Sequence, residues 1–238
     1  MLLPGPQPGK ASVPVLVELF TSEGCSSCPP ADEVLTVLLK EQPVAGATVI
    51  PLGLHVTYWD ELGWKDRAAL PDATRRQESY GRVFGGDRIY TPQMVVDGRD
   101  EFVGSDAGAA RKAIERAAKQ PHARLTSTAV VEGNAIVAAT TVSALPPEAV
   151  RESLEATLVI TEDGLSTVVK RGENGGRTLR HDAVVRQVVA LGKVGDAVEL
   201  RSRVPLRSEW QRDRLNAVFF VQGRRTQRIW GAAAMPLR

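Results

Sequence analysis

The sequence predicts an α/β domain over residues 13–120 followed by an all-β, antiparallel sandwich-like domain over residues 121–238. Two observations predict this order. Near the N-terminus, an apolar run, an amphipathic segment and a second apolar run follow one another, which is the pattern of a strand–helix–strand unit. After residue 121, short alternating runs are separated by turn signals, as in antiparallel sandwiches. The 238 residues are enough for two domains.

The first unit begins after a proline- and glycine-rich stretch, residues 1–12, which we expect to be flexible. Residues 13–20 and 48–56 are mostly apolar and are predicted to be buried strands. Between them, apolar residues recur with i, i+3, i+4 spacing and predict a helix from about Ser26 to Lys40. A connection of this length implies that the two strands are parallel, with a right-handed crossover.

The remaining elements are predicted from local signals. In the α/β domain we expect a short helix near Trp64–Leu70, a helix from an Asp72 N-cap to about Phe84, a hairpin over residues 92–103 with an Asp97–Gly98 turn, and a helix over residues 105–119. In the second domain, the alternating runs that predict strands are residues 125–131, 135–142, 156–160, 184–191 and 217–221.

Composition excludes several classes of protein. With 43% hydrophobic residues and only 21 Gly and 15 Pro, the chain can bury a core and is not low-complexity. A formal net charge of +2 gives no argument for a nucleic-acid or membrane-surface partner. No apolar run approaches the ~18 residues of a spanning helix. Met1–Lys10 lacks the features of an intact export signal, so the residues alone leave the compartment open.

The cysteine count is the most informative number. The chain has 2 cysteines, Cys25 and Cys28, which is too few for a disulfide-scaffolded miniprotein. A zinc site is disfavoured, because no second cysteine pair completes a set of four ligands and the histidines His55, His122 and His181 are scattered.

The pair follows the first predicted strand and opens the first predicted helix, and a CxxC motif in this context predicts a dithiol redox site. A helix N-terminus presents free N–H groups and positive dipole, which stabilise a thiolate. We therefore predict that Cys25 is the exposed nucleophile and that Cys28, three residues on, is the resolving thiol.

Three alternatives use the same residues differently. A structural disulfide that closes so small a ring contributes only about 2 kcal/mol. A Cu(I)-handling module would bind the metal through Cys25 and Cys28, since soft sulfur ligands select Cu(I); Met94 is a further soft ligand but is predicted to lie in the core. An interaction protein would only present a binding edge.

Thr91–Pro92 precedes the third predicted strand, at the sheet edge where the two parallel strands end. A cis peptide bond there would bring backbone close to the cysteines and offer an edge to an extended substrate. Taken alone, a proline before a strand is more often in trans, and its position after a CxxC unit raises the expectation of cis.

Other polar and aromatic residues are expected near this edge. Tyr58 and Trp59 follow the second strand and are candidates for an apolar wall around a substrate, although Trp59 and Trp64 are equally explained as core residues. His55 is expected to be a satisfied structural histidine. Glu23 would raise the pKa of the Cys25 thiol if it faced the sulfur. A glycine-rich hairpin carrying Arg177, Arg180 and His181 is predicted to be a solvated loop, with a lid over the redox edge as the alternative.

Four motifs together resemble the DUF1223 family, a largely uncharacterised bacterial group with a thioredoxin-like fold: ELFTSEGCSSCPPAD at residues 18–32, HVTYWDELGWKD at 55–66, YTPQMVVDGRDEFVGSD at 90–106 and GENGGRTLRHDAVV at 172–185. The resemblance implies a thioredoxin-like domain with a β-rich extension and export to the periplasm; otherwise the protein is expected in the cytoplasm. It matches Cys25 and Cys28 to the redox pair and Pro92 to the cis-proline position. The Ser-Ser dipeptide between the cysteines departs from the Gly-Pro of thioredoxin, which leaves the direction of electron flow open.

The function predicted from these observations is that of a thiol–disulfide oxidoreductase. Cys25 and Cys28 are its predicted catalytic residues, and Thr91, Pro92, Trp59 and Tyr58 are its predicted substrate-binding residues. No cofactor is expected, because no GxGxxG motif follows a strand. The predicted partners are a disulfide-containing protein or small thiol as substrate and a redox partner protein.

Overall fold

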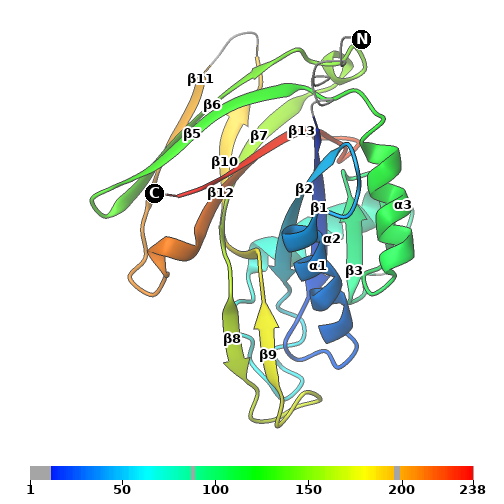
Figure 1. Cartoon of the computed structure of the whole chain (residues 1–238), viewed down its shortest axis with the longest axis vertical. Helices are drawn as coiled ribbons and strands as arrows, with labels where there is room; N and C mark the ends of the chain where they lie inside the picture. Colours follow the sequence, from blue (N-terminus) through cyan, green and yellow to red (C-terminus); the bar gives the residue numbers. More distant parts are fainter. Residues whose placement is uncertain (1–11, 87–88, 196–198, 238) are drawn as a thin grey trace, which may run out of the picture.

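The structure is a computed structural model that describes residues 12–86, 89–195 and 199–237. The N-terminal stretch predicted to be flexible, apart from Ser12, lies outside the described residues. Among those described, the strands form an eight-stranded, a three-stranded and a two-stranded sheet. Figure 1 shows the helices gathered around the first strands of the chain, away from the three-stranded sheet.

The predicted strand–helix–strand unit is confirmed. Strands β1 (Val13–Thr21) and β2 (Ala47–His55) are parallel, and helix α1 (Pro29–Glu41) connects them. The helix begins with two prolines, which suits its first turn because the N–H groups there have no partner within the helix. Cys28 is the N-cap of α1, so both cysteines precede the body of the helix.

The predicted hairpin and the helix after it are also confirmed. Strands β3 (Gln93–Val96) and β4 (Asp100–Val103) are antiparallel, and β3 pairs antiparallel with β1. Arg99 N donates to Val96 O (2.9 Å) and closes a turn with positive φ at both central residues, Asp97 (47°) and Gly98 (62°), as a type I′ turn requires. Helix α3 (Ala107–Ala117) follows, with Asp106 as its N-cap.

Two predictions in the region before α2 (Pro71–Val83) are wrong. Residues 64–70 form turns and extended chain in place of a short helix, because the segment wraps around the Asp66 carboxylate, which accepts hydrogen bonds from the amides of Glu23 (2.9 Å) and Ala68 (2.8 Å). The N-cap of α2 is Leu70 and not Asp72, since the helix already begins at Pro71.

All five runs predicted as strands after residue 121 are strands, and four further strands were not predicted. The three-stranded sheet contains β5 (Arg124–Glu132), β6 (Ala135–Ser143) and β11 (Glu199–Pro205), while β8 (Leu165–Val168) and β9 (Thr178–His181) form a hairpin. The large sheet receives β7 (Leu154–Glu162), β10 (Val184–Lys193), β12 (Leu215–Gly223) and β13 (Ile229–Pro236). Two short 3₁₀ helices span Ala149–Arg151 and Arg212–Arg214.

The large sheet crosses the boundary predicted near residue 121. Its strand order is β13-β12-β7-β10-β2-β1-β3-β4, and the two parts of the chain meet where β10 pairs with β2. Gly53 makes this junction: its amide donates to Ala183 O (2.8 Å), and a Cβ at position 53 would lie 3.3 Å from Asp182 O. Residue 121 therefore separates two sets of strands but not two sheets.

Strand β1 organises the core because its side chains alternate between two faces. Val15, Val17 and Leu19 pack in a cluster that includes residues of α1 and α3. Leu16 and Phe20 pack in a second cluster with residues of α2 and β12. The loop that carries the cysteines thus follows a strand whose last seven residues are all buried. None of the helices within the described ranges is long and apolar enough to cross a membrane.

Candidate functional site

Cys25 and Cys28 are joined by a disulfide, with their Cα atoms 5.4 Å apart. They lie in two consecutive turns, in which Cys25 N donates to Ser22 O and Cys28 N donates to Cys25 O, both at 3.2 Å. The Ser27 hydroxyl lies 3.4 Å from the Cys25 sulfur. The pair therefore sits where the sequence predicted it, between the end of β1 and the start of α1.

The prediction that Cys25 is exposed is wrong. Cys25 and Cys28 are both 0% exposed, whereas Ser26 and Ser27 between them face solvent. Segments distant in the sequence pack against the backbone of the loop that carries the sulfurs, while the two serines project outward. Two such segments contact the loop.

One covering segment contains Trp59 and the Thr91–Pro92 peptide bond, which is cis as predicted. Trp59 Nε1 donates to Thr91 Oγ1 (2.8 Å), and a Cβ at Gly24 would lie 3.2 Å from Trp59 Cβ. Trp59 thus reaches from the residue before Cys25 to the residue before Pro92.

The other predicted site residues differ in their surroundings. Pro92 lies close to α1, because a Cβ at Gly104 would touch both Ala31 and Pro92. Tyr58 points its hydroxyl to Gln77 on α2, to which it donates at 3.1 Å. Met94 is fully buried in the core, as expected.

A second covering segment is the connection between β8 and β9, residues 169–177, which we call the strap. Asn174 is 0% exposed and its Nδ2 donates to Glu23 O and to Cys25 O, both at 2.9 Å. Glu173 Oε2 accepts from Ser26 N (3.0 Å). A Cβ at Gly172 would lie 3.2 Å from Trp64 Cβ, so glycine permits this close approach.

The strap corrects the prediction of a solvated loop in this hairpin. Arg177 and Arg180 are both exposed as expected, but Asn174 is buried and accepts from Arg177 (2.9 Å), and His181 is only 5% exposed. The sequence analysis missed Glu173 and Asn174 because a polar, glycine-rich loop carries no periodic pattern that predicts what it covers.

Beneath the cysteine loop, five titratable side chains from different elements form what we call the acid–imidazole cluster: Glu23, Asp32, His55, Asp66 and His181. His55 Nδ1 lies 2.6 Å from Asp66 Oδ2, and His181 Nδ1 lies 3.5 Å from Asp32 Oδ2. The two imidazole rings meet edge to face with centroids 4.8 Å apart. Asp32 belongs to α1, one turn after Cys28.

Burial and neighbouring charge set the protonation states of the cluster. Burial alone would lower the pKa of His55 and raise that of Asp66, but their mutual attraction outweighs it, so the pKa of His55 rises to about 9 and that of Asp66 falls to about 2. Burial raises the pKa of Asp32 to about 7. Burial, aided by the charge of His55, lowers the pKa of His181 to about 3. At neutral pH, His55 and Asp66 are therefore charged and His181 is neutral.

Glu23 does not act on the Cys25 sulfur in the way considered from the sequence. Its carboxylate accepts from Trp64 Nε1 (2.7 Å) and lies 3.8 Å from His181 Nε2. Burial, followed by the charge of Asp66, raises the pKa of Glu23.

The cluster contains polar atoms without partners. Within the described residues, His55 Nε2 and both ring nitrogens of His181 are buried and make no hydrogen bond. His55, expected to be a satisfied histidine, is therefore only half satisfied, because Asp66 occupies one nitrogen. An unpaired buried polar group costs about 1–3 kcal/mol, and such groups gather where a protein does chemistry.

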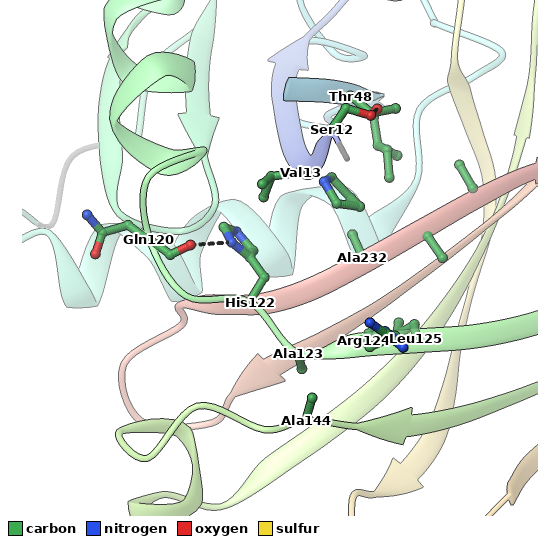
Figure 2. A pocket seen from close by; sticks show the side chains of 14 residues that line it. Ser12, Val13, Thr48, Gln120, His122, Ala123, Arg124, Leu125, Ala144 and Ala232 are labelled. Atoms are coloured by element: carbon green, nitrogen blue, oxygen red, sulfur yellow. Dashed lines mark hydrogen bonds between the residues drawn. The ribbon is translucent and has the colours of Figure 1, made fainter. Parts of the chain in front are cut away.

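In the part of the chain that the structure describes, no group of three or more His, Cys, Asp or Glu side chains is arranged to hold a metal ion. At the opposite end of β1, Val13, Pro14 and small side chains of β13 line a cavity of about 540 Å³. His122 also lines it, and its Nδ1 lies 2.9 Å from Gln120 O (Figure 2). The cysteines do not line this cavity.

Comparison with known proteins identifies solved structures of similar fold and a protein family. No curated protein matches it. Two solved structures have the same overall fold. Protein AGR_C_4864 from Agrobacterium tumefaciens is 25% identical, with 94% of each chain covered and a TM-score of 0.69. HBP35 of Porphyromonas gingivalis is 14% identical, with 97% of this chain and 77% of that chain covered and a TM-score of 0.67.

The match to a protein family covers most of the chain. Residues 16–222 match DUF1223, whose description is "protein of unknown function". The matched range includes the cysteine pair, the Thr91–Pro92 bond, the strap and every member of the acid–imidazole cluster. The chain therefore belongs to the DUF1223 family.

Proposed function

We propose that this protein is a thiol–disulfide oxidoreductase that cycles Cys25 and Cys28 between a dithiol and a disulfide. The observation that carries the proposal is the disulfide itself, located between β1 and the N-terminus of α1. A reversible disulfide at a helix N-terminus benefits from the free N–H groups and the helix dipole, which stabilise a thiolate.

We propose a thioredoxin-like arrangement for residues 13–120. The order β2-β1-β3-β4, with β1 and β2 parallel and β3 and β4 antiparallel, supports this proposal, as does the cis bond before β3. The β-rich part of the chain then acts as an extension that joins the same sheet and supplies the strap.

In the proposed reaction, the Cys25 thiolate attacks a substrate disulfide, forms a mixed disulfide and releases one substrate thiolate. The Cys28 thiolate then attacks the Cys25 sulfur, which forms the Cys25–Cys28 disulfide and releases the second substrate thiolate. Ser27 supports this assignment, since its hydroxyl lies 3.4 Å from the Cys25 sulfur and can donate to a thiolate there. The electrons come from the dithiol, so the reaction needs no further cofactor.

A substrate reaches Cys25 in this proposal only when the strap moves. Asn174 and Glu173 hold the strap through three hydrogen bonds to the cysteine loop. Displacement of the strap would uncover the sulfurs beside Trp59, Tyr58, Thr91 and Pro92, which we propose as the substrate-binding surface. Substrates are then disulfides in proteins or small thiols, and a redox partner restores the dithiol.

The test uses the reduced protein and an aromatic disulfide whose thiolate product is coloured. The wild-type protein is expected to release coloured thiolate in two phases. Cys28→Ser is expected to release it only once and to retain the reagent as a mixed disulfide, detected by mass. Cys25→Ser is expected to lose the rapid phase, while Ser26→Ala, at an exposed position, reacts as wild type. A Cys25→Ser variant that reacts as rapidly as wild type would overturn the proposal.

A further inference from the structure

The reaction proposed above requires a proton to leave a buried place. Cys28 is 0% exposed, and as a thiol it must lose its proton before it attacks the mixed disulfide. Bulk water does not reach the sulfur directly in this structure. Some buried group must therefore take the proton at that moment, and it must be able to exchange it with solvent afterwards.

Asp32 is placed to take it. Asp32 follows Cys28 by four residues, and its amide donates to Cys28 O (3.1 Å), so the two residues lie on the same face of the first turn of α1. Residues at this spacing have Cβ atoms roughly 5–6 Å apart. A carboxylate at that distance can accept a proton from the thiol directly or through one water. Asp32 is 7% exposed, and its Oδ2 lies 3.5 Å from His181 Nδ1.

His181 is placed between Asp32 and solvent. Its Nδ1 lies 3.5 Å from Asp32 Oδ2, and its ring also lines a groove of about 460 Å³ between α1 and the β8–β9 hairpin. The other groove residues include Glu33, Thr36 and Lys40 of α1. No hydrogen-bond partner occupies either ring nitrogen within the described ranges. A neutral imidazole with both nitrogens available can accept a proton at one and release a proton from the other.

We propose that Asp32 accepts the proton of the Cys28 thiol and exchanges it with solvent through His181, a role that rests on the thiol–disulfide function proposed above. Asp32 takes the proton as Cys28 becomes a thiolate; the thiolate attacks the Cys25 sulfur, the Cys25–Cys28 bond forms, and the bond to the substrate sulfur breaks. The departing thiolate takes its proton from water. The substrate disulfide gains two electrons and the dithiol loses them.

The surroundings suit this relay. Asp32 is faced by His55 of β2, Glu23 of the cysteine loop and Asp66 of the following loop. Burial raises its pKa to about 7, against the opposite pull of His55, so its carboxylate and carboxyl forms are both populated near neutral pH. His181 is faced by His55, Asp66 and Asp182 and stays neutral, because burial lowers its pKa to about 3. It therefore passes a proton on and does not retain it.

The experiment separates the two phases of thiolate release by the reduced protein. The first phase is formation of the mixed disulfide at Cys25, and the second is attack by Cys28. Asp32→Asn is expected to slow the second phase by about 10²-fold at pH 7 and leave the first within about twofold. His181→Gln is expected to slow the second phase by about tenfold. Glu41→Gln, at an exposed carboxylate in the last turn of α1 and outside this groove, is the control and is expected to react as wild type.

The pH dependence distinguishes a proton acceptor from a merely structural residue. In wild type, the second phase is expected to accelerate through about pH 7, and in Asp32→Asn this inflection is expected to disappear. A second phase equally fast in Asp32→Asn and Glu41→Gln would overturn this inference while the first phase still supports the function. If Asp32→Asn does not fold, the pH dependence of the second-phase rate in wild type is the test. A rate without an inflection near pH 7 would overturn the inference. Absence of the first phase in wild type would instead refute the proposed function.

Discussion

Two buried groups of charged side chains lie on opposite faces of the large sheet, and they are built differently. The acid–imidazole cluster lies beside α1, while the second group, the Glu18–Arg76 cluster, consists of Glu18, Arg76, Tyr80 and Gln222. In the second cluster, Arg76 donates to both Glu18 carboxylate oxygens, to Gln222 Oε1 (2.8 Å) and to Tyr80 OH (3.1 Å). Its guanidinium carbon also lies 4.7 Å from the centroid of the Phe220 ring.

Both clusters join the two parts of the chain, yet only one of them is satisfied. Gln222 of β12 completes the Glu18–Arg76 cluster, in which each charge has its partners. His181 of β9 enters the acid–imidazole cluster with both ring nitrogens unpaired in the described structure. A satisfied network holds elements together, whereas an unsatisfied one retains acceptors and donors that chemistry can use. Similar burial therefore comes with fully paired charges on one face of the sheet and with unpaired ring nitrogens on the other.

The largest expected effect is on the satisfied cluster. Arg76→Met leaves the Glu18 carboxylate buried without its counter-charge and is expected to lower the free energy of unfolding by about 3–5 kcal/mol. Urea unfolding at pH 7 measures this loss. The double variant Glu18→Met/Arg76→Met removes both charges and is expected to recover much of it. If Arg76→Met is as stable as wild type, the buried Glu18–Arg76 ion pair contributes no more to stability than an exposed ion pair does, and the contrast between the two clusters fails.

The next largest effect is a gain of stability, expected for Asp32→Asn. Asp32 has a pKa of about 7 in the folded protein, above the value of about 3.9 for an unfolded chain, so folding binds a proton between these values and wild-type stability falls as pH rises through them. Asp32→Asn lacks this loss and is expected to be more stable than wild type by roughly 2–4 kcal/mol at pH 8, with the gain nearly absent at pH 4. Urea unfolding at both pH values measures it.

Glu33→Gln is the control for this pH series, and its stability should parallel that of wild type. If Asp32→Asn is more stable than wild type but resolves mixed disulfides slowly, the Asp32 carboxylate lowers stability and speeds the reaction. The two clusters would then differ in what their buried charges do. An Asp32→Asn variant that loses stability at pH 8 would show that the carboxylate is a satisfied structural group after all.

A smaller effect is expected for the strap. Asn174→Ala removes two hydrogen bonds to buried carbonyls of the cysteine loop and is expected to cost about 1–3 kcal/mol. The loosened strap should let a phosphine reductant reach the disulfide about tenfold faster. Asn134→Ala, in an exposed turn, is the matched control. Equal reduction rates in the two variants would mean that the strap does not limit access.

The smallest effect is expected at the exposed edge of the strap. Glu173 accepts a hydrogen bond from Ser26 N at the surface. Hydrogen bonding to the side chain of Ser26, followed by that to its backbone, lowers the pKa of Glu173. Glu173→Gln is expected to change the rate of disulfide reduction by less than about threefold, because an exposed charge contributes little. A change as large as that of Asn174→Ala would mean that the exposed Glu173 carboxylate holds the strap as strongly as the buried Asn174 amide does.

The sequence by itself determined the local features of the site. The parallel strand–helix–strand unit, the cysteine pair at the start of α1 and the Asp97–Gly98 hairpin follow from periodicity, proline placement and turn chemistry, all of which act over a few residues. The cis bond at Pro92 was also predictable, since it follows from the position of a proline relative to that unit.

Only the tertiary structure decided what surrounds the cysteines. Asn174 bonds to Glu23 across 151 positions of sequence, and His181 meets Asp32 from another strand, so no local pattern encodes either contact. Tertiary contacts also decided that no helix forms over the segment predicted near Trp64, where hydrogen bonds to the Asp66 carboxylate replace those of a helical turn. Burial and the resulting pKa values depend on every element packed around a group, and such packing exists only once the chain has folded.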